Sequence, residues 1–358
     1  MTILTAAESL ADLVGNTALL KLQSLSQLTQ CEIFVKCEFQ NPGGSVKDRA
    51  ALQMVLEAEQ SGKLKPGMTI VEGTAGNTGI GLAVVAKSRG YNLKVVMPKG
   101  QAKEKEQLIE LHGAELVLVD AVPFANENHF YHTARRIAEQ NPDYWWADQF
   151  ENTANSNAHF LTTGPEIFQQ TDGQLDCFVS VAGTGGTLGG ISKYLKQKDP
   201  NTKIVSVDPD GSGILNFLMN GKHQATAGSS FTEGIGIMRL VNNFKQGKID
   251  YGLNLPDSDI VTVANYVRKQ DALVLGSSSA LNVTAALYCA VQTGPLNGGK
   301  PQKIVTIACD AGERSVSKLY NEAFLASKNI QSDAQSIEHL IERYKTEINR
   351  LQHVEFNL

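Results

Sequence analysis

The chain has 358 residues, of which 42% are hydrophobic and 19% charged, and 32 Lys and Arg against 37 Asp and Glu give a formal charge of −5. This composition suits a packed protein of about two domains, and the acidic excess argues against nucleic acid as a partner, because phosphate binding needs a basic surface. No apolar run approaches the roughly 20 residues that cross a bilayer, and the first residues carry Glu8 and Asp12 instead of a basic leader, so a cytoplasmic protein without membrane contact is expected.

Short β-branched runs recur along the chain, and each is followed by a turn and a stretch with helical spacing. The runs are Glu32–Lys36, Thr69–Glu72, Leu93–Met97, Glu115–Val119, Cys177–Val181, Ile204–Asp208 and Ile304–Cys309. This alternation predicts an α/β fold with a largely parallel sheet covered by helices on both faces. The last periodic stretch, Ser332–Leu351, predicts one amphipathic helix.

The first segment with chemical interest runs from Asn41 to Arg49 and reads Asn-Pro-Gly-Gly-Ser-Val-Lys-Asp-Arg. It opens a predicted helix with Lys47 in the first turn, where the helix dipole disfavours a cation. A lysine in such a place can serve as a nucleophile or a base. Taken alone, however, Lys47 is explained better as a solvated surface residue.

Glycine-rich turns follow two of the predicted strands, at Gly73–Gly79 and at Gly183–Thr187, and each runs into a helix. Glycines let the backbone approach an anion, and free N–H groups at a helix start can bind it, so Gly183–Thr187 predicts a phosphate site. A tight turn without a ligand explains the spacing about equally well. A dinucleotide-binding loop is a rival that Asp208 favours, but Leu188 stands where its third glycine is needed.

Other polar clusters favour structural interpretations. The five cysteines are widely spaced and form no C-x-x-C pair, and His129 and His132 have no evident third ligand, so no metal site is predicted. The mixed run Lys103–Glu106 predicts a solvated helix face.

The segments together resemble the family of cysteine synthase and cystathionine β-synthase, pyridoxal-phosphate enzymes of the tryptophan-synthase-β-like fold (fold type II). The matching segments follow the family's order: Gly15–Thr17, Asn41–Arg49, Thr74–Thr78, Gln149–Phe150, Thr162–Glu166, Gly183–Thr187, Glu233–Gly236, Gly276–Ser279 and Asp310–Arg314. The resemblance implies two three-layer α/β lobes with mostly parallel sheets and a cleft between them. Residues 45–150 would form a small mobile lobe with the substrate loop, residues 1–44 and 151–330 a large lobe with the phosphate loop, and residues 331–358 a C-terminal helical tail.

The resemblance also implies a role for each matching residue. Lys47 would form a Schiff base with pyridoxal 5'-phosphate and then move the Cα proton. Asn77 would bind the ring oxygen of the cofactor, and Ser278 its pyridine nitrogen. The phosphate would be held by Gly183, Thr184, Gly185, Gly186 and Thr187. The substrate would be bound by Thr74, Ala75, Gly76, Thr78, Gln149 and Gly234.

The activity implied is a β-replacement in a homodimeric enzyme of amino-acid metabolism. O-acetylserine, or a similar activated serine, would lose its Cβ substituent to give an aminoacrylate, and sulfide or a thiol would add to make cysteine. A cysteine desulfhydrase or a cystathionine β-synthase-type activity is the alternative, and an NAD-binding oxidoreductase is the alternative from another class. Ala75 replaces the family's usual serine, and Lys99–Ala102 also departs from its pattern, which leaves the leaving group and the nucleophile open.

Overall fold

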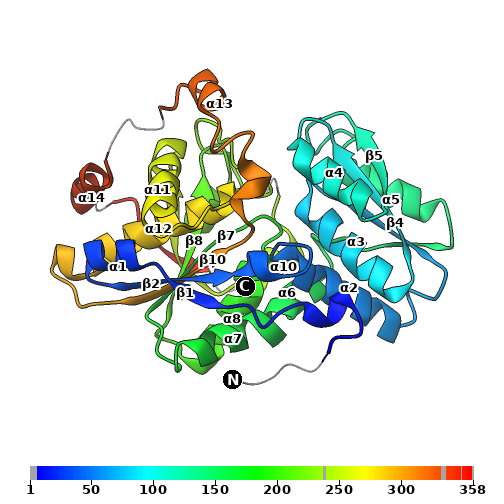
Figure 1. Ribbon diagram of the computed structural model, residues 1–358, viewed down its shortest axis with the longest axis horizontal. Coiled ribbons are helices and arrows are strands. Elements are labelled where there is room, and N and C mark those ends of the chain that lie inside the picture. Colours follow the sequence, from blue (N-terminus) through cyan, green and yellow to red (C-terminus); the bar gives the residue numbers. More distant parts are fainter. Residues whose placement is uncertain (1–5, 237–238, 332–335, 348, 357–358) are drawn as a thin grey trace.

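The computed structural model describes residues 6–236, 239–331, 336–347 and 349–356, and these residues build two sheets that helices cover (Figure 1). We call the seven-stranded sheet with its helices the large lobe. We call the four-stranded sheet with α2, α3, α4 and α5 the small lobe. Most strand pairs are parallel, which confirms the predicted α/β fold class.

The large sheet has the strand order β1-β2-β10-β7-β8-β9-β11. Its strands are β1 (Leu19–Lys21), β2 (Glu32–Cys37), β7 (Cys177–Val181), β8 (Lys203–Pro209), β9 (Ile249–Leu255), β10 (Lys303–Ala308) and β11 (Gln352–Phe356). Only the two edge strands, β1 and β11, pair in the antiparallel direction within the described residues. The central strand β7 is buried along its whole length, as expected of a parallel strand with helices on both sides.

The helices of the large lobe lie above and below this sheet in Figure 1. They are α1 (Gln23–Thr29), α6 (Ala154–Ala158), α7 (Gly164–Gln170), α8 (Gly186–Lys198), α9 (Ile214–Asn220), α10 (Asn242–Lys245), α11 (Asp257–Gln270), α12 (Ser277–Thr293), α13 (Glu322–Ser327) and α14 (Ile337–Thr346). Short helical turns are η1 (Leu10–Leu13), η2 (Glu38–Gln40), η3 (His159–Thr163), η4 (Pro295–Asn297) and η5 (Gly312–Ser315). One apolar core joins this sheet to its helices.

The small sheet has the order β5-β4-β3-β6 and is parallel throughout. Its strands are β3 (Thr69–Gly73), β4 (Asn92–Pro98), β5 (Glu115–Val119) and β6 (Tyr144–Trp146), and its helices are α2 (Lys47–Gln60), α3 (Asn77–Arg89), α4 (Lys103–Leu111) and α5 (Phe130–Glu139). Side chains of α2 and α3 form the core on one face, and a smaller cluster beneath α5 fills the other. The small lobe therefore has three layers.

All the strands predicted from β-branched runs are confirmed, with ends within one residue of the prediction. The predicted helix Ser332–Leu351 is only partly right. Helix α14 covers Ile337–Thr346, and residues 332–335 and 348 lie outside the described residues. The prediction of a helical tail is wrong at Gln352–Phe356, because Val354 and Phe356 are buried in strand alternation and the segment pairs with β9.

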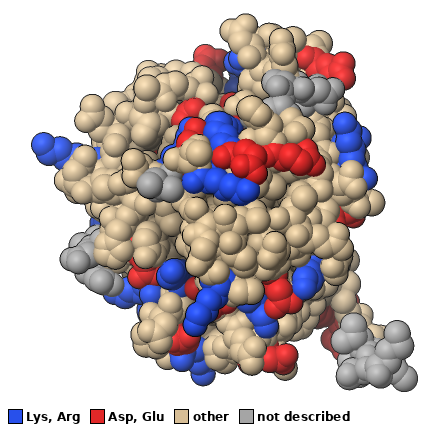
Figure 2. Space-filling view, turned by 90° about the vertical axis from the view of Figure 1, so that its left-hand side faces the viewer, with Lys and Arg blue, Asp and Glu red and all other residues tan. Residues whose placement is uncertain are grey.

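Charges of both signs are interspersed on the face of the large lobe that Figure 2 shows. Ion pairs near α14 illustrate this mixing, such as Lys345 with Glu342 and Arg350 with Glu347. None of the helices in the described ranges is long and apolar enough to cross a membrane.

Candidate active site

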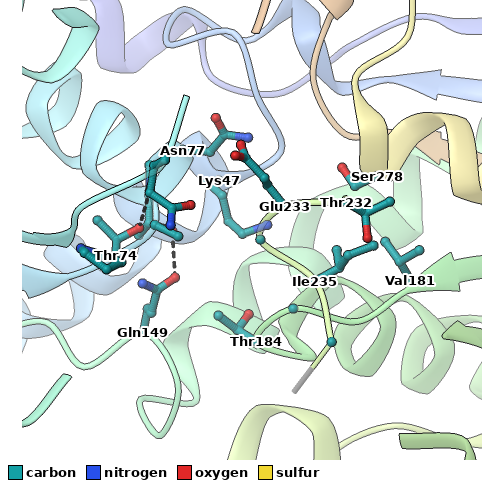
Figure 3. A pocket seen from close by; sticks show the side chains of 18 of the residues that line it. Lys47, Thr74, Asn77, Gln149, Val181, Thr184, Thr232, Glu233, Ile235 and Ser278 are labelled. Atoms are coloured by element: carbon teal, nitrogen blue, oxygen red, sulfur yellow. Dashed lines mark hydrogen bonds between the residues drawn. The ribbon is translucent and has the colours of Figure 1, made fainter. Parts of the chain in front are cut away.

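A cavity of about 530 Å³ lies where the two lobes meet, at the carboxyl ends of strands from both sheets. The small lobe contributes the turn after β3, and the large lobe contributes the turn after β7 and the start of α12. Carboxyl ends of parallel strands are the usual place for a ligand, because loops and helix N-termini gather there. In Figure 3, Lys47 lies between Asn77 and Gln149 on one side and Ser278 and Ile235 on the other.

Lys47 is the first residue of α2 and lies on the wall of this cavity. The backbone before it is tied to the large lobe, since Ser45 forms a bridge with Asp310 and the Val46 N–H donates to the Cys309 carbonyl at 2.8 Å. The lysine therefore stands on the junction between the lobes. The neighbouring Cys309 thiol also lines the cavity, and burial raises its pKa to about 12.

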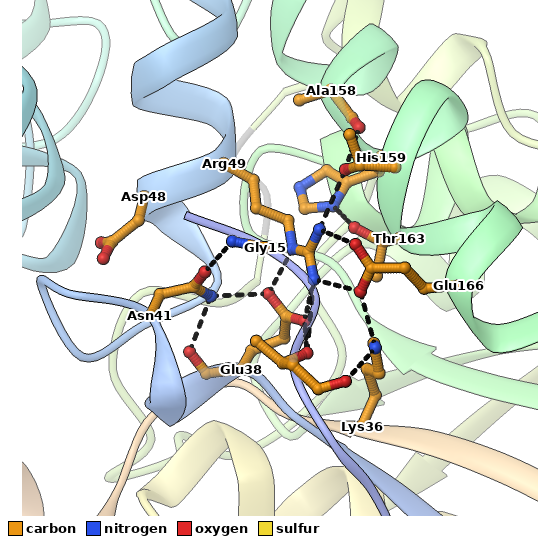
Figure 4. Close-up of polar contacts among 12 residues, drawn as sticks. Gly15, Lys36, Glu38, Asn41, Asp48, Arg49, Ala158, His159, Thr163 and Glu166 are labelled. Atoms are coloured by element: carbon orange, nitrogen blue, oxygen red, sulfur yellow. Dashed lines mark hydrogen bonds and ion pairs between the residues drawn. The ribbon is translucent and has the colours of Figure 1, made fainter. Parts of the chain in front are cut away.

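A buried ionic cluster fixes the helix that carries Lys47 (Figure 4). Arg49 donates to both oxygens of Glu38, at 2.7 and 2.9 Å, and to both oxygens of Glu166, at 2.7 Å each. The Lys36 ammonium adds a 2.6 Å ion pair to Glu166. Burial disfavours the charge of Glu166, but Arg49 and Lys36 outweigh it and lower the pKa of this carboxyl to about 2. Two anions are thus matched by two cations.

The turn Gly183–Thr187 fits an anion such as a phosphate. A Cβ atom on Gly183 would lie 2.1 Å from the Gly234 carbonyl oxygen, and Gly185 has a φ of +82°, so the backbone needs glycine at both places. Helix α8 starts at Gly186, and the N–H groups of its first turn have no partner within the helix. These features suit an anion on geometry as well as on sequence.

Two threonine hydroxyls complete the turn. The Thr184 oxygen accepts hydrogen bonds from Asn155 Nδ2 at 2.9 Å and from the Gly186 N–H at 3.3 Å, so its hydrogen is left to donate. The Thr187 oxygen lies 3.2 Å from Nε2 of the fully buried His159. Burial, reinforced by the nearby Arg49 and Lys47 charges, lowers the pKa of His159 well below its ordinary value, so the imidazole is neutral. Because the His159 ring is neutral, it adds no positive charge beside the Gly183–Thr187 turn.

Ser278 and Asn77 supply single polar groups on opposite sides of the cavity. Ser278 is in the first turn of α12, and its side chain is buried on the cavity wall. Asn77 is the first residue of α3, and its amide contacts Asp310 and Arg314. An amine, a hydroxyl, an amide and an anion site around one cavity fit a phosphorylated pyridine aldehyde, with Lys47 as the only group of the four that can bond covalently to it.

The predicted substrate loop Thr74–Thr78 lines the small-lobe side of the cavity. Gln149 lies behind it, and both of its amide hydrogens are already used: Nε2 donates to Glu72 Oε1 at 2.9 Å and to the Gly73 carbonyl at 3.0 Å, while Oε1 accepts from Thr78 Oγ1 at 2.6 Å. Burial, with Asp148 nearby, raises the pKa of Glu72 well above its ordinary value. In this conformation Gln149 supports the loop, and it must release a bond before its amide can reach a substrate.

Of the predicted site residues, Gly186 alone does not line the cavity within the described structure. The others are Lys47, Thr74, Ala75, Gly76, Asn77, Thr78, Gln149, Gly183, Thr184, Gly185, Thr187, Gly234 and Ser278. Gly186 lies behind the wall, where its N–H group orients the Thr184 hydroxyl.

A charged contact between the lobes, which the sequence does not indicate, also lies on the cavity wall. Glu233 pairs with Lys105 Nζ at 2.5 Å and also with Lys318. Burial favours the neutral form of Glu233, but the two lysines outweigh it and lower the pKa of the carboxyl. The expectation that Lys103–Glu106 is a solvated face is therefore wrong for Lys105, whose side chain is only 7% exposed. No local pattern could indicate this, because the partner is remote in sequence.

Arg239 was also missed, and it lines the cavity among aromatic rings. Its guanidinium lies 4.7 Å from the ring centroids of Phe124 and Tyr131, and it pairs with Glu151 at 2.5 Å. Cation–π contacts of this kind link the large lobe to the small lobe.

Comparisons with known proteins agree with this geometry. The profile of the family described as "Pyridoxal-phosphate dependent enzyme" matches residues 10–310. Cysteine synthase 1 of Emericella nidulans is 46% identical over 327 residues, which is 90% of this chain and 87% of that protein. Cysteine synthase 2 of Schizosaccharomyces pombe is 44% identical over 342 residues, 89% of this chain and 85% of that protein.

Two solved structures share the fold over most of their length. The O-acetylserine-dependent cystathionine β-synthase from Helicobacter pylori has a TM-score of 0.78 at 32% identity and covers 88% of this chain and 99% of its own. An O-ureido-L-serine synthase has a TM-score of 0.79 at 30% identity and covers 94% of this chain and all of its own.

Proposed function

The chain belongs to the family of pyridoxal-phosphate-dependent enzymes, and on this premise we propose that it makes cysteine from O-acetylserine and sulfide. The observation that carries the proposal is the convergence of Lys47, Asn77, Ser278 and the Gly183–Thr187 turn on one cavity. The names of the relatives supply cysteine as the product, and the name of one structural neighbour supplies O-acetylserine; sulfide comes from the family resemblance.

Each group on the cavity wall has a separate role in the proposed reaction. Pyridoxal phosphate, when bound, withdraws electrons from the substrate Cα so that the Cβ substituent can leave. Lys47 Nζ holds the cofactor and then holds or moves the proton at Cα. The N–H groups of the Gly183–Thr187 turn and the hydroxyls of Thr184 and Thr187 bind the phosphate. The uncharged Ser278 hydroxyl would bind the ring nitrogen and leave it unprotonated.

The small lobe selects and covers the substrate. The Thr74–Thr78 loop, with Gln149 behind it, binds the substrate carboxylate, and Gly234 leaves room beside the amino group. The cavity wall then excludes water, which would otherwise compete with sulfide at Cβ. We propose that residues 45–150 move as this lobe against residues 1–44 and 151–330, which the two separate sheets support. The proposal of a homodimer rests on the family resemblance, and that of a cytoplasmic location on the composition of the chain.

The alternative activities have less support. The relatives do not favour a desulfhydrase, and their family excludes the dinucleotide interpretation of Asp208. That carboxylate accepts the N–H groups of Ile214 and Leu215 at 3.0 and 3.1 Å, so it caps α9 instead of binding a ribose. Cystathionine synthesis is the second candidate, because a structural neighbour has that name.

Borohydride reduction of the cofactor-loaded protein, followed by peptide mapping, tests the central assignment. The cofactor mass is expected on Lys47, and Lys47→Ala should lower cysteine formation by on the order of 10²- to 10⁴-fold or more. Lys36 is the matched control, because it is a buried lysine held by Glu166. Cofactor mass on Lys36 would refute the assignment. Faster reaction with homocysteine than with sulfide would favour the second candidate.

A further inference from the structure

The side-chain amide of Asn77 is held by two charged groups that have so far been given no function. Its Nδ2 donates to Asp310 Oδ2 at 2.7 Å, and its Oδ1 accepts from Arg314 Nη1 at 2.9 Å. Asp310 follows β10, and Arg314 lies in η5, so both come from the large lobe while Asn77 opens a small-lobe helix. The amide is therefore bonded across the junction of the lobes.

These partners allow only one orientation of the amide. A guanidinium can only donate and an ionised carboxylate can only accept, so a flipped Asn77 would place donor against donor and acceptor against acceptor. Nδ2 carries two hydrogens, and Asp310 takes one of them. The second hydrogen is the donor that Asn77 has left for the cavity.

Both charged groups are themselves tightly placed. Asp310 is 5% exposed, its carbonyl accepts from Ser279 Oγ at 2.9 Å, and a Cβ on Gly276 would lie 1.9 Å from its Oδ1. The second terminal nitrogen of Arg314, Nη2, donates a hydrogen bond to the carbonyl of Gly43, which lies four residues before Lys47. The amide is thus fixed relative to the helix that carries the lysine.

We propose that Asp310 and Arg314 are positioning residues that make Asn77 an obligate hydrogen-bond donor to the cofactor's ring oxygen and so keep that oxygen deprotonated. This inference rests on the proposed function, because it assumes the cofactor in this cavity. A fixed donor stabilises a charged acceptor and cannot accept a hydrogen bond from its protonated form. An amide free to flip would serve either form.

The test is a pH titration of the visible absorption band of the cofactor-loaded protein. In Asp310→Asn and Arg314→Met, half of the band should be lost on acidification at a pH about 0.5 to 1 unit higher than in the parent protein. The dissociation constant of the cofactor should rise by about 2- to 12-fold. Arg314→Lys keeps a donor of the same charge. Its titration midpoint and its dissociation constant for the cofactor should therefore lie between those of Arg314→Met and the parent protein.

Asp208→Asn is the matched control, because Asp208 is also a buried carboxylate at the end of a parallel strand of the same sheet, where it accepts the N–H groups of Ile214 and Leu215. Asp208→Asn should leave the pH at which half of the visible band is lost unchanged. Asn77→Ala removes the donor itself and should shift the titration at least as far as Asp310→Asn does, and combining the two substitutions should shift it no further than Asn77→Ala alone.

The outcomes separate the two proposals. A parent protein that gains no visible band with pyridoxal phosphate contradicts the proposed function. A parent band that titrates identically in Asp310→Asn and Arg314→Met, while Asn77→Ala shifts it, overturns the inference. An equal shift in Asp208→Asn overturns it too, since loss of any buried carboxylate would then suffice.

Discussion

Asp48 follows Lys47 in sequence, but its carboxyl lies in the contact between α2 and α3. Oδ2 accepts from the Gly43 N–H at 2.5 Å, Oδ1 has no partner among the described residues, and a Cβ on Gly81 would lie 3.0 Å from Oδ1. Burial raises the pKa of Asp48 to about 7. The neutral form of the carboxyl is therefore more stable in this buried contact than the charged form.

The raised pKa predicts a pH dependence of stability. An unfolded aspartate has a pKa of about 3.9, so between about pH 4 and 7 the folded state holds a proton that the unfolded state has lost. Stability from this group therefore falls as the pH rises through that window. Asp48→Asn cannot lose a proton, and its urea midpoint relative to the parent should rise from pH 5 to pH 8. The control is Asp120→Asn, whose carboxyl is exposed. Equal pH slopes in parent and Asp48→Asn would refute the account.

Single residues also show what the sequence could predict about the site. The position of Lys47 and of Gly183–Thr187 on one cavity was predictable only through the family resemblance, since Lys47 alone is better explained as a solvated lysine and a turn without a ligand fits the glycine spacing about equally well. Lys105 was not, since its neighbours alternate in charge as on a solvated face, and only the remote Glu233 reveals its role. Asp310 and Arg314 were visible as a motif, but their contact with Asn77 depends on the junction of the lobes.

The position of helix α2 depends on the ionic cluster around Arg49, so replacing Arg49 should destabilise the protein. Arg49→Leu would leave Glu38, whose side chain is fully buried, without its cation. Breaking a buried pair in this way costs about 3–5 kcal/mol. The measurement is the free energy of unfolding from urea titration. Arg89→Leu removes a more exposed pair with Glu59 and should cost only about 0–1 kcal/mol. Similar losses in both variants would contradict a special role for the cluster.

Elements were predicted well where a run of residues is long and apolar. The short strands β1 and β6 have three residues each, too few to show a period. Strand β11 was missed because a helical stretch precedes it closely and because its pairing with β9 joins residues about a hundred positions apart. Such pairings are decided by the sheet edge and not by the segment itself.

At the scale of the whole molecule, the two lobes are joined by contacts that surround the cavity. Asn77 contacts Asp310 and Arg314 on one side, and Arg239 packs on Phe124 and Tyr131 on another. Glu233 pairs with Lys105 of the small lobe and with Lys318 on the wall of the same cavity. Any movement of the small lobe against the large lobe would therefore have to break some of these contacts.

Glu233→Gln tests whether the pair with Lys105 holds the small lobe closed. The amide keeps the shape of the side chain but removes its charge, so the buried Lys105 ammonium loses its ion pair and the closed form is disfavoured. On the proposal that the small lobe closes on the amino-acid substrate, KM should rise by about tenfold for each 1.4 kcal/mol lost, with a smaller change in kcat. Hydrogen–deuterium exchange of the unliganded protein should become faster in α4 and in the Thr74–Thr78 loop. Glu59→Gln breaks the pair with Arg89 within the small lobe and should change neither measurement. Unchanged exchange in α4 of Glu233→Gln would show that other contacts hold the lobes together, with Arg239 the next to replace.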